Sequence, residues 1–228
     1  MDPMQRFLLE VTVEALDSAG IRFEGIRGSR TSVHTGCPSD DYFHQLLKGP
    51  QQLPNYSAVG ASQSMLANRI SWFFDLRGPS FNIDSACSSS ALAIEYACHL
   101  LRSRQTNMGI AAGCNITIDP DLTAVLGNNQ MLSPDGRCYT FDNRTNGYAR
   151  GEGVAVVILK RLPDALRDND TIRAIIRAVA SIQDGRTASI TQPDIRAQSQ
   201  LIRETYAKAG LSLSHTRFFK AHGTGEWP

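Results

Sequence analysis

The sequence lacks the features that mark several common classes of protein. Its 228 residues carry 23 lysines and arginines against 22 aspartates and glutamates, so no excess charge points to a nucleic-acid partner. No apolar run approaches the length of a membrane span, and the first residues do not form a signal peptide. The five cysteines are widely spaced and include no Cys-x-x-Cys pair. That spacing argues against a disulfide framework or a zinc ribbon and favours a reducing, cytoplasmic setting.

Two glycine-rich stretches lack the context of a nucleotide site. Residues 147–153 precede a predicted strand instead of opening a helix, which excludes a dinucleotide-binding fingerprint. The stretch Gly223-Thr224-Gly225 is not followed by the Gly-Lys-Ser/Thr of a phosphate-binding loop. The acidic residues between positions 119 and 142 do not have calcium-loop spacing. The sequence therefore indicates no metal site.

What the sequence does contain is typical of a globular α/β protein. Apolar residues make up 42% and charged residues 20% of the chain. Apolar periodicity predicts helices over residues 4–19, 40–48, 63–74, 91–101 and 194–209, and a loop at 56–60. Asp2 and Asp194 are the predicted caps of the first and last of these helices, and Gly20 and Gly210 are their predicted ends. The helix at 91–101 can be capped by Ser88, Ser89 and Ser90. Strands are predicted over residues 31–36, 81–83, 108–116, 154–159, 172–182 and 218–221. The strand at 154–159 contains no polar residue, which predicts that both of its faces are covered. Because strands and helices alternate, the expected class is α/β in layers.

One stretch organises the chain: a short strand, a tight turn of small residues, and then a helix. The turn, residues 84–90, is called the Cys87 turn below. The residues after it are apolar nearly throughout, which predicts a helix buried on all sides. Cys87 would lie at the start of that helix, where unpaired amides and the helix dipole favour a thiolate. The amide of Cys87 itself would donate to an oxyanion, and a buried structural cysteine is the alternative interpretation.

A cysteine nucleophile needs a base or a cation as partner, and five histidines are available. Three lie in polar stretches and are predicted to be ordinary surface residues: His34, His44 and His215. His99 lies on the helix after Cys87, about three turns away, and is predicted to be a core or edge residue. His222 ends a predicted strand and opens Gly223-Thr224-Gly225, which is where α/β proteins place active sites. It is the candidate catalytic histidine, with a structural histidine as the alternative.

At these residues the chain resembles the β-ketoacyl synthase (ketosynthase) domain of modular-type polyketide and fatty-acid synthases, and most of all fungal reducing polyketide synthases. The motifs are Asp84-Ser85-Ala86-Cys87-Ser88-Ser89-Ser90 and Ala221-His222-Gly223-Thr224-Gly225. Supporting stretches lie at residues 2–10, 64–69, 131–137, 147–153 and 183–187. The resemblance covers essentially the whole chain, and the combination of motifs in order is highly specific.

The resemblance implies a thiolase-like fold, layered α/β/α/β/α with two similar halves, and a homodimer. It implies decarboxylative Claisen condensation, in which Cys87 accepts an acyl group from the phosphopantetheine of an acyl-carrier protein. A malonyl-type thioester then loses carbon dioxide and attacks the acyl-cysteine, while His222 assists decarboxylation and stabilises the enolate. It implies no cofactor bound by the domain itself, and neither a nucleic-acid nor a membrane partner.

The sequence departs from the family pattern near its end. Gly225 is followed by Glu226-Trp227-Pro228, and Lys220 stands where family members often have glutamate. The family's first strand, a later lysine, a second catalytic histidine and a Gly-Phe-Gly-Gly stretch have no counterpart here. Residues 1–228 are therefore expected to form a partial ketosynthase domain, mainly the first half of the fold. Three hypotheses stay open: a condensing enzyme or a piece of one, a non-catalytic remnant or dimerisation piece, and a thiolase-type enzyme acting on coenzyme A thioesters.

Overall fold

The computed structural model describes residues 1–49, 51 and 53–225, which divide into two compact units. Unit 1 comprises residues 1–120 and 151–175. Unit 2 comprises residues 121–150 and those from 176 onward. The departure from the family pattern at residues 226–228 lies outside the described residues.

Unit 1 is built on a four-stranded sheet in the order β2-β1-β3-β4. The strands are β1 (Ser32–Gly36), β2 (Ser80–Ile83), β3 (Met108–Asn115) and β4 (Gly153–Lys160). The two neighbours of β1 are parallel to it, whereas β4 runs antiparallel to β3. All four strands lie where the sequence predicts them. Parallel strands need helical crossovers, and the intervening helices cover both faces of this sheet.

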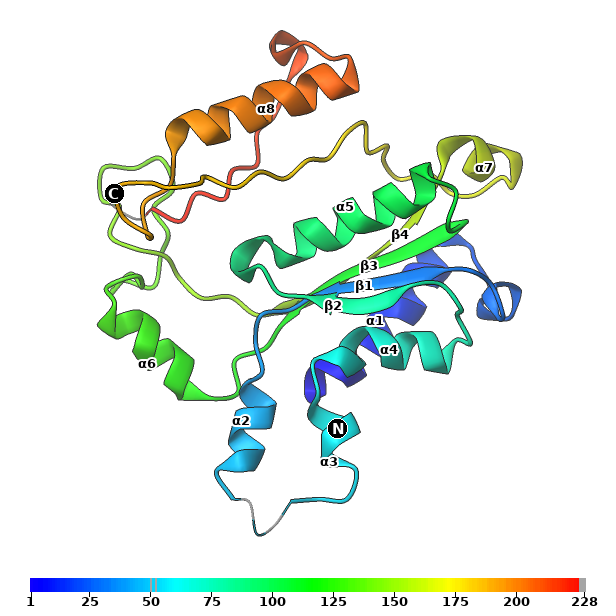
Figure 1. Cartoon of the computed structure of the whole chain (residues 1–228), viewed down its shortest axis with the longest axis horizontal. Helices are drawn as coiled ribbons and strands as arrows, with labels where there is room; N and C mark the ends of the chain where they lie inside the picture. The colour runs from blue at the N-terminus through cyan, green and yellow to red at the C-terminus, as the bar shows by residue number, and fades with distance from the viewer. Residues whose placement is uncertain (50, 52, 226–228) are drawn as a thin grey trace. The chain divides into compact units, whose positions relative to one another are not determined.

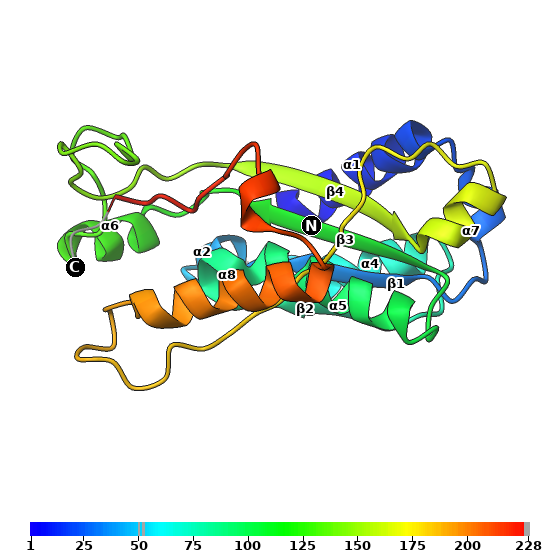
Figure 2. The ribbon, with the colours of Figure 1, turned by 90° about the horizontal axis from the view of Figure 1, so that it is seen from above.

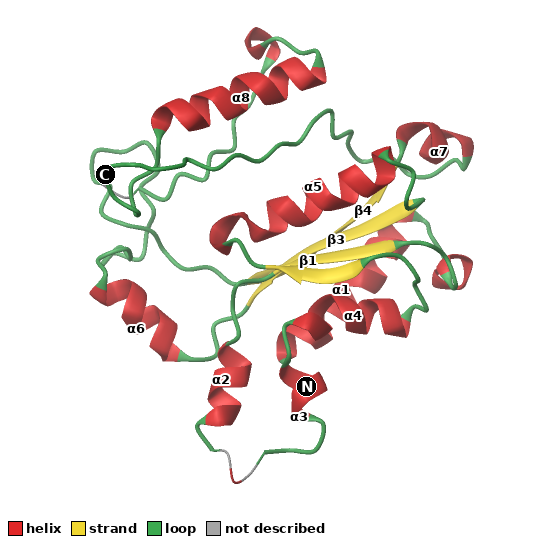
Figure 3. Cartoon of the chain, viewed as in Figure 1, coloured by secondary structure: helices red, strands yellow, loops and turns green. Residues whose placement is uncertain are grey.

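One face of the sheet carries α1 (Pro3–Ala19) and α4 (Ser64–Phe73), and the other carries α5 (Ser89–Arg102) (Figures 1 and 2). The shorter helices of this unit are α2 (Asp41–Leu47), α3 (Ser57–Ala61) and α7 (Leu162–Arg167) (Figure 3). The predicted helices 4–19, 40–48 and 63–74 are thus confirmed. The loop predicted at residues 56–60 is wrong, because α3 forms there.

The bounds of α1 follow from its first and last residues. The Asp2 carboxylate accepts a hydrogen bond of 2.8 Å from the N–H of Met4, and Pro3 occupies the first turn, where it removes no helical bond. Gly20 ends the helix in the left-handed conformation, with φ of 72°. These are the signals by which the sequence predicted this helix.

The two faces of the sheet pack differently. Large side chains of α1 and α4, including Leu8, Leu66 and Ile70, form the main core with Val33 and Ile110 of the sheet. Under α5 the core consists of small residues, Ala93, Ala97 and Ala111. The small side chains bring α5 close to the strands. A Cβ added at Gly36 would lie 2.5 Å from the Ser89 carbonyl oxygen, and one at Gly113 would lie 2.8 Å from the Ser90 Cβ.

The described residues of unit 2 form two α-helices, a short 3-10 helix at Leu213–His215 and long irregular segments. Most of α6 (Pro120–Asn128) belongs to it, and its longest helix is α8 (Ile195–Ala209). As predicted, Asp194 caps α8 by accepting from the N–H groups of Arg196 and Ala197, and Gly210 ends it in the left-handed conformation. No helix within the described residues combines the length and the apolar character that crossing a membrane requires.

Two predicted strands do not form among the described residues. Residues 172–182 and 218–221 are irregular, and Phe218 and Phe219 are 79% and 61% exposed. An extended segment becomes a strand only when a neighbouring strand forms hydrogen bonds with its backbone N–H and C=O groups. A high β propensity does not provide that neighbouring strand. The apolar residues that favoured a strand at 172–182, such as Ile175, are exposed for the same reason.

Two burial predictions are also wrong. Only one face of α5 is buried. Ala91, Tyr96 and His99 lie elsewhere on this helix and are exposed. In β4 every second residue of the first half, such as Val157, is exposed, because α1 covers one face of this edge strand only. A run of apolar residues shows that burial is favourable, but it does not show which neighbouring helix or strand covers those residues.

His34 is the main misplaced histidine, because it was predicted at the surface and has no exposed area. It lies in the middle of β1, opposite Phe81 of β2, and their ring centroids are 4.5 Å apart. Neither ring nitrogen has a hydrogen-bond partner among the described residues. Burial lowers the pKa of His34 from 6.5 to about 4, so the ring is neutral at pH 7. His44 and His215 are exposed, as predicted.

We predict that Gly36→Ala destabilises the protein by at least about 3 kcal/mol, because the new Cβ would overlap the main chain of Ser89 and Ser90. Urea unfolding followed by circular dichroism measures this loss. Gly25→Ala is the matched control, since no atom lies within 4 Å of a Cβ at that position. Equal stability of the two variants would contradict the tight contact between β1 and α5.

His34 should also make stability depend on pH. The unfolded chain binds the His34 proton near pH 6.5 and the folded chain only near pH 4, so stability falls as the pH drops through this window. The expected loss is about 3 kcal/mol. Urea unfolding at pH 7, 5.5 and 4.5 measures this loss. In His34→Phe the free energy of unfolding should no longer show this decrease as the pH falls. An unchanged slope in the variant would show that other groups cause the dependence.

Candidate active site

The structure places Cys87 as the sequence predicts, exposed at the start of α5. The chain leaves β2 at Ile83, forms a single 3-10 turn over Ala86–Ser88 and enters α5 at Ser89. Ala86 has φ of 52°, in the left-handed region that a non-glycine residue rarely adopts. Such a conformation persists only where the surroundings enforce it, and it is found most often at functional sites.

Hydrogen bonds from side chains of the Cys87 turn stabilise this conformation of Ala86. The Asp84 carboxylate accepts from the N–H of Ala86 at 3.0 Å. The Ser89 hydroxyl accepts from the N–H of Ser85 at 2.9 Å and donates to the carbonyl of Ala86 at 2.6 Å. The Ser88 hydroxyl donates to the carbonyl of Ser85 at 3.0 Å. The serines were predicted to cap the helix, and they instead stabilise the turn before it.

The end of β2 is in turn fixed to β1. The Asn82 side chain accepts from the Thr35 hydroxyl at 2.8 Å and donates to the carbonyl of Cys37 at 3.0 Å. The N–H of Cys37 donates to the carbonyl of Ile83 at 3.1 Å. The strand that leads into the Cys87 turn therefore has both backbone and side-chain bonds to its neighbour. The sequence alone does not distinguish Asn82, because a single amide in a strand has no distinctive spacing.

The other cysteines are less accessible than Cys87. Three of them, Cys37, Cys98 and Cys114, are buried, and Cys138 is half-buried. A hydrogen bond to Cys37, together with burial, raises the pKa of the Cys114 thiol, and burial raises the pKa of Cys98. Thiolates react and thiols do not, so these environments protect Cys98 and Cys114 from electrophiles, whereas Cys37 is protected by its burial.

His222 belongs to unit 2, where it is exposed beside a polar loop. The Thr140 hydroxyl donates to the carbonyl of Gly223 at 2.6 Å, and the Thr145 hydroxyl and the N–H of Gly147 each donate to the carbonyl of Gly225 at 3.0 Å. The long polar stretch between residues 133 and 153 thus holds the segment that follows His222. Cys87 belongs to unit 1, so its convergence with His222 stays a prediction.

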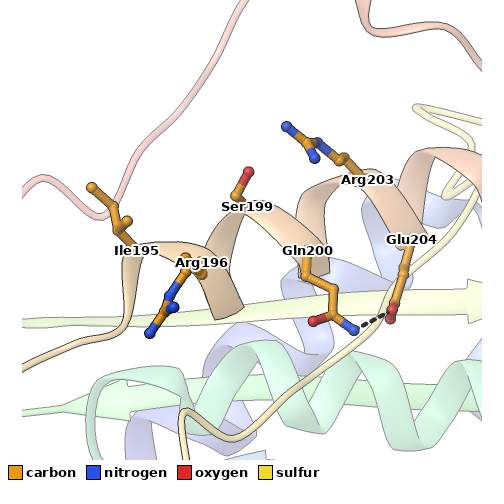
Figure 4. A pocket seen from close by; sticks show the side chains of 6 residues that line it. All are labelled: Ile195, Arg196, Ser199, Gln200, Arg203 and Glu204. Atoms are coloured by element: carbon orange, nitrogen blue, oxygen red, sulfur yellow. Dashed lines mark hydrogen bonds between the residues drawn. The ribbon is translucent and has the colours of Figure 1, made fainter. Parts of the chain in front are cut away.

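A shallow hollow of about 510 Å³ lies on the surface of α8 (Figure 4). It is lined by Ile195, Arg196, Ser199, Gln200, Arg203 and Glu204. Gln200 donates to Glu204 at 2.7 Å. No cysteine or histidine lines this hollow, so it offers neither a thiol nucleophile nor an imidazole base. Among the residues that the structure describes, no three His, Cys, Asp or Glu side chains are grouped so as to hold a metal.

Comparison with known families agrees with this geometry. Residues 1–165 match the family described as β-ketoacyl synthase, N-terminal domain, and residues 173–226 match the β-ketoacyl synthase, C-terminal domain. The chain belongs to the β-ketoacyl synthase family. The resemblance inferred from the motifs around Cys87 and His222 is therefore confirmed.

Fungal polyketide synthases are among the relatives of this ketosynthase chain. It is 51% identical to the highly reducing polyketide synthase alnA of Emericella nidulans and 49% identical to the compactin diketide synthase mlcB of Penicillium citrinum. Each match covers 99% of this chain but only 9% of the relative. The chain thus spans less than a tenth of the length of these synthases.

Solved ketosynthases share the fold. The ketosynthase from module 6 of the bacillaene synthase of Bacillus subtilis 168 superposes with a TM-score of 0.91 at 34% identity, over 99% of this chain and 38% of that one. The oxazolomycin ketosynthase domain OzmH KS7 of Streptomyces albus JA3453 gives a TM-score of 0.91 at 33% identity, over 98% of this chain and 38% of that one. The predicted thiolase-like α/β class is confirmed.

Cys87 should be the most reactive thiol of this ketosynthase chain, because it is exposed while Cys37, Cys98 and Cys114 are buried. Limiting iodoacetamide followed by peptide mapping should place most of the adduct on Cys87. Cys138 is half-buried and serves as the internal competitor. Preferential labelling of any other cysteine would contradict the assignment of Cys87 as the nucleophile.

Proposed function

We propose that this chain accepts an acyl group on Cys87, as the first half-reaction of a decarboxylative Claisen condensation. The observation that carries the proposal is an exposed cysteine in a strained turn at the start of a helix, fixed by Asp84 and Ser89. Membership of the β-ketoacyl synthase family supports it. The printed names of the relatives, which are polyketide synthases, support a role in secondary metabolism.

The proposed step is an acyl transfer between two sulfur atoms. The Cys87 thiolate attacks the carbonyl carbon of an acyl thioester, a new carbon–sulfur bond forms, and the carbonyl oxygen becomes an oxyanion. The N–H of Cys87 lies before the first intrahelical bond of α5 and is placed to donate to that oxygen. Collapse of the tetrahedral intermediate breaks the original carbon–sulfur bond and releases the carrier thiol.

In the second half-reaction, His222 acts on the extender unit. A malonyl-type thioester loses carbon dioxide, and the resulting carbanion attacks the acyl carbonyl carbon on Cys87. A carbon–carbon bond forms, the acyl carbon–sulfur bond breaks, and Cys87 leaves as the thiolate. The His222 imidazole stabilises the enolate oxygen that decarboxylation generates. This role rests on the match of Ala221-His222-Gly223-Thr224-Gly225 to the family motif and on the bonds that hold the segment after His222.

The partners follow from this chemistry. Both acyl groups arrive on the phosphopantetheine of an acyl-carrier protein, and the domain itself binds no cofactor. The reaction type is that of a 3-oxoacyl-[acyl-carrier-protein] synthase. Residues 1–228 supply part of such a domain, and a homodimer is its expected assembly, with β2 at the edge of the sheet available to a second copy. The cytoplasmic setting expected from the spacing of the cysteines stays a prediction.

A second candidate is a non-catalytic remnant or a dimerisation piece. The observation that favours it is the exposure of apolar residues in unit 2, with Phe218 and Phe219 uncovered just before His222. Exposed apolar side chains of this size promote association with other chains. In this case the chain would retain the fold around Cys87 without completing a reaction.

We expect the chain to become acylated at Cys87 but not to complete condensation. Acylation needs the thiolate and the donors of the Cys87 turn, whereas decarboxylation in the family uses two histidines, and residues 1–228 supply one of them, His222. The loss of one such group typically costs about 10²–10⁴ in rate. Purified chain is incubated with acyl-carrier protein thioester and malonyl-carrier protein and analysed by intact mass spectrometry.

The control is Cys87→Ala, which should show no adduct. An acyl adduct on the wild type without a β-ketoacyl product is the expected result. Robust β-ketoacyl formation would overturn the need for a second histidine. A folded wild-type chain with no adduct at all would favour the remnant. Acylation from acyl-coenzyme A but not from the carrier protein would favour a thiolase-type enzyme.

A further inference from the structure

Successive peptide groups of the Cys87 turn are each held by a side chain. The peptide joining Asp84 to Ser85 donates its N–H to the Ser89 hydroxyl, and the next one donates its N–H to the Asp84 carboxylate. The peptide joining Ala86 to Cys87 is held through its carbonyl, which accepts from the Ser89 hydroxyl at 2.6 Å. One hydroxyl therefore clamps the turn on both sides of the strained Ala86.

The peptide group that joins Ala86 to Cys87 carries the N–H that can donate to the reacting thioester. A trans peptide is planar, and its N–H points away from its C=O. No cis peptide bond occurs among the described residues. When the Ala86 carbonyl points at the buried Ser89 hydroxyl, the N–H of Cys87 on the same plane must therefore point away from Ser89. Cys87 itself is exposed, so a thioester approaches its sulfur from solvent.

We propose that Ser89 is a positioning residue that aims the Cys87 N–H at the oxyanion formed during acyl transfer. The inference rests on the proposed acylation of Cys87. Ser89 does not touch the thioester. Its hydroxyl fixes the plane of the peptide between Ala86 and Cys87, and with it the direction of the donor. The N–H of Ser89 donates to the same carbonyl, so loss of the hydroxyl would leave that backbone bond alone to hold the plane of this peptide.

The support itself is rigid, as a positioning residue requires. Ser89 is only 2% exposed, and its main chain lies against Gly36, where a Cβ would be 2.5 Å from its carbonyl oxygen. A side chain clamped between the sheet and the helix keeps its rotamer, and its hydroxyl keeps both hydrogen bonds. The sheet thereby fixes the position of Ser89, and Ser89 in turn fixes the direction of the Cys87 N–H.

The test compares two reactions at the same sulfur atom. Acylation by a small acyl thioester, such as an N-acetylcysteamine thioester, forms an oxyanion and needs a directed N–H donor. Alkylation by iodoacetamide forms no oxyanion and needs only an accessible thiolate. In Ser89→Ala the acylation rate constant of Cys87 should fall about tenfold relative to its alkylation rate constant, as expected for a misdirected oxyanion donor.

Ser103→Ala is the matched control. The Ser103 hydroxyl also donates to the carbonyl three residues earlier, that of Leu100 at 3.2 Å, but at the far end of α5. Its ratio of acylation to alkylation should equal that of the wild type. Ser89→Thr keeps the hydroxyl and should stay within about twofold of the wild type. Circular dichroism establishes that each variant is folded, and Ser89→Gly replaces Ser89→Ala if the latter is not.

The outcomes separate this inference from the function on which it rests. A folded wild-type chain that is alkylated but never acylated would overturn the proposed function. Normal acylation of the wild type with an unchanged ratio in Ser89→Ala would overturn the role of Ser89 alone. A fall in Ser89→Thr as large as that in Ser89→Ala would overturn it too, because the hydroxyl would then not be the decisive group.

Discussion

The contact between Gly36 of β1 and the first turn of α5 is the constraint on which the geometry around Cys87 depends. The main chains of Ser89 and Ser90 lie where any side chain at position 36 would be. This close approach fixes the start of the helix relative to the sheet, and the bonds from Asn82 to β1 fix the end of β2. The five residues between Ile83 and Ser89 must form a tight turn, and the strained backbone conformation falls on Ala86.

The hydrogen bonds of the turn explain how that strain is maintained. Each bond is worth about 1 kcal/mol, which is comparable to the cost of one residue in the left-handed region. Asp84 and Ser89 together supply three such bonds around Ala86, enough to offset that cost. The exposed position of Cys87 is therefore a consequence of local packing and local bonding, and it needs no residue of unit 2.

The sequence predicted those features that depend on neighbouring residues. The caps Asp2 and Asp194, the terminal glycines of α1 and α8, and the turn of small residues before Cys87 are local signals, and the structure agrees with each of them. The family followed from two motifs with specific chemistry, and the comparisons confirm it. His222 was singled out in the same way, and its catalytic role stays a prediction.

Features that depend on distant contacts were predicted less well. His34 was assigned to the surface because its neighbours are polar, but β2, β3 and α5 cover it. The residues at 172–182 and 218–221 have the composition of strands, yet no neighbouring strand pairs with them among the described residues. The clamping role of Ser89 was also missed, since its hydroxyl bonds become visible only when the turn is seen in three dimensions.

The division into two units places the two halves of the proposed reaction on different parts of the chain. The residues described above as shaping the Cys87 turn, from Gly36 to Ser89, belong to unit 1, whereas His222 and the polar loop that holds the following glycines belong to unit 2. In the proposed mechanism, acyl transfer to Cys87 uses groups of unit 1, and the second half-reaction uses the His222 imidazole of unit 2. A change in unit 2 should therefore leave the acylation of Cys87 intact. The chemistry of the first step can thus be studied through Cys87 alone, independently of how His222 is brought to it.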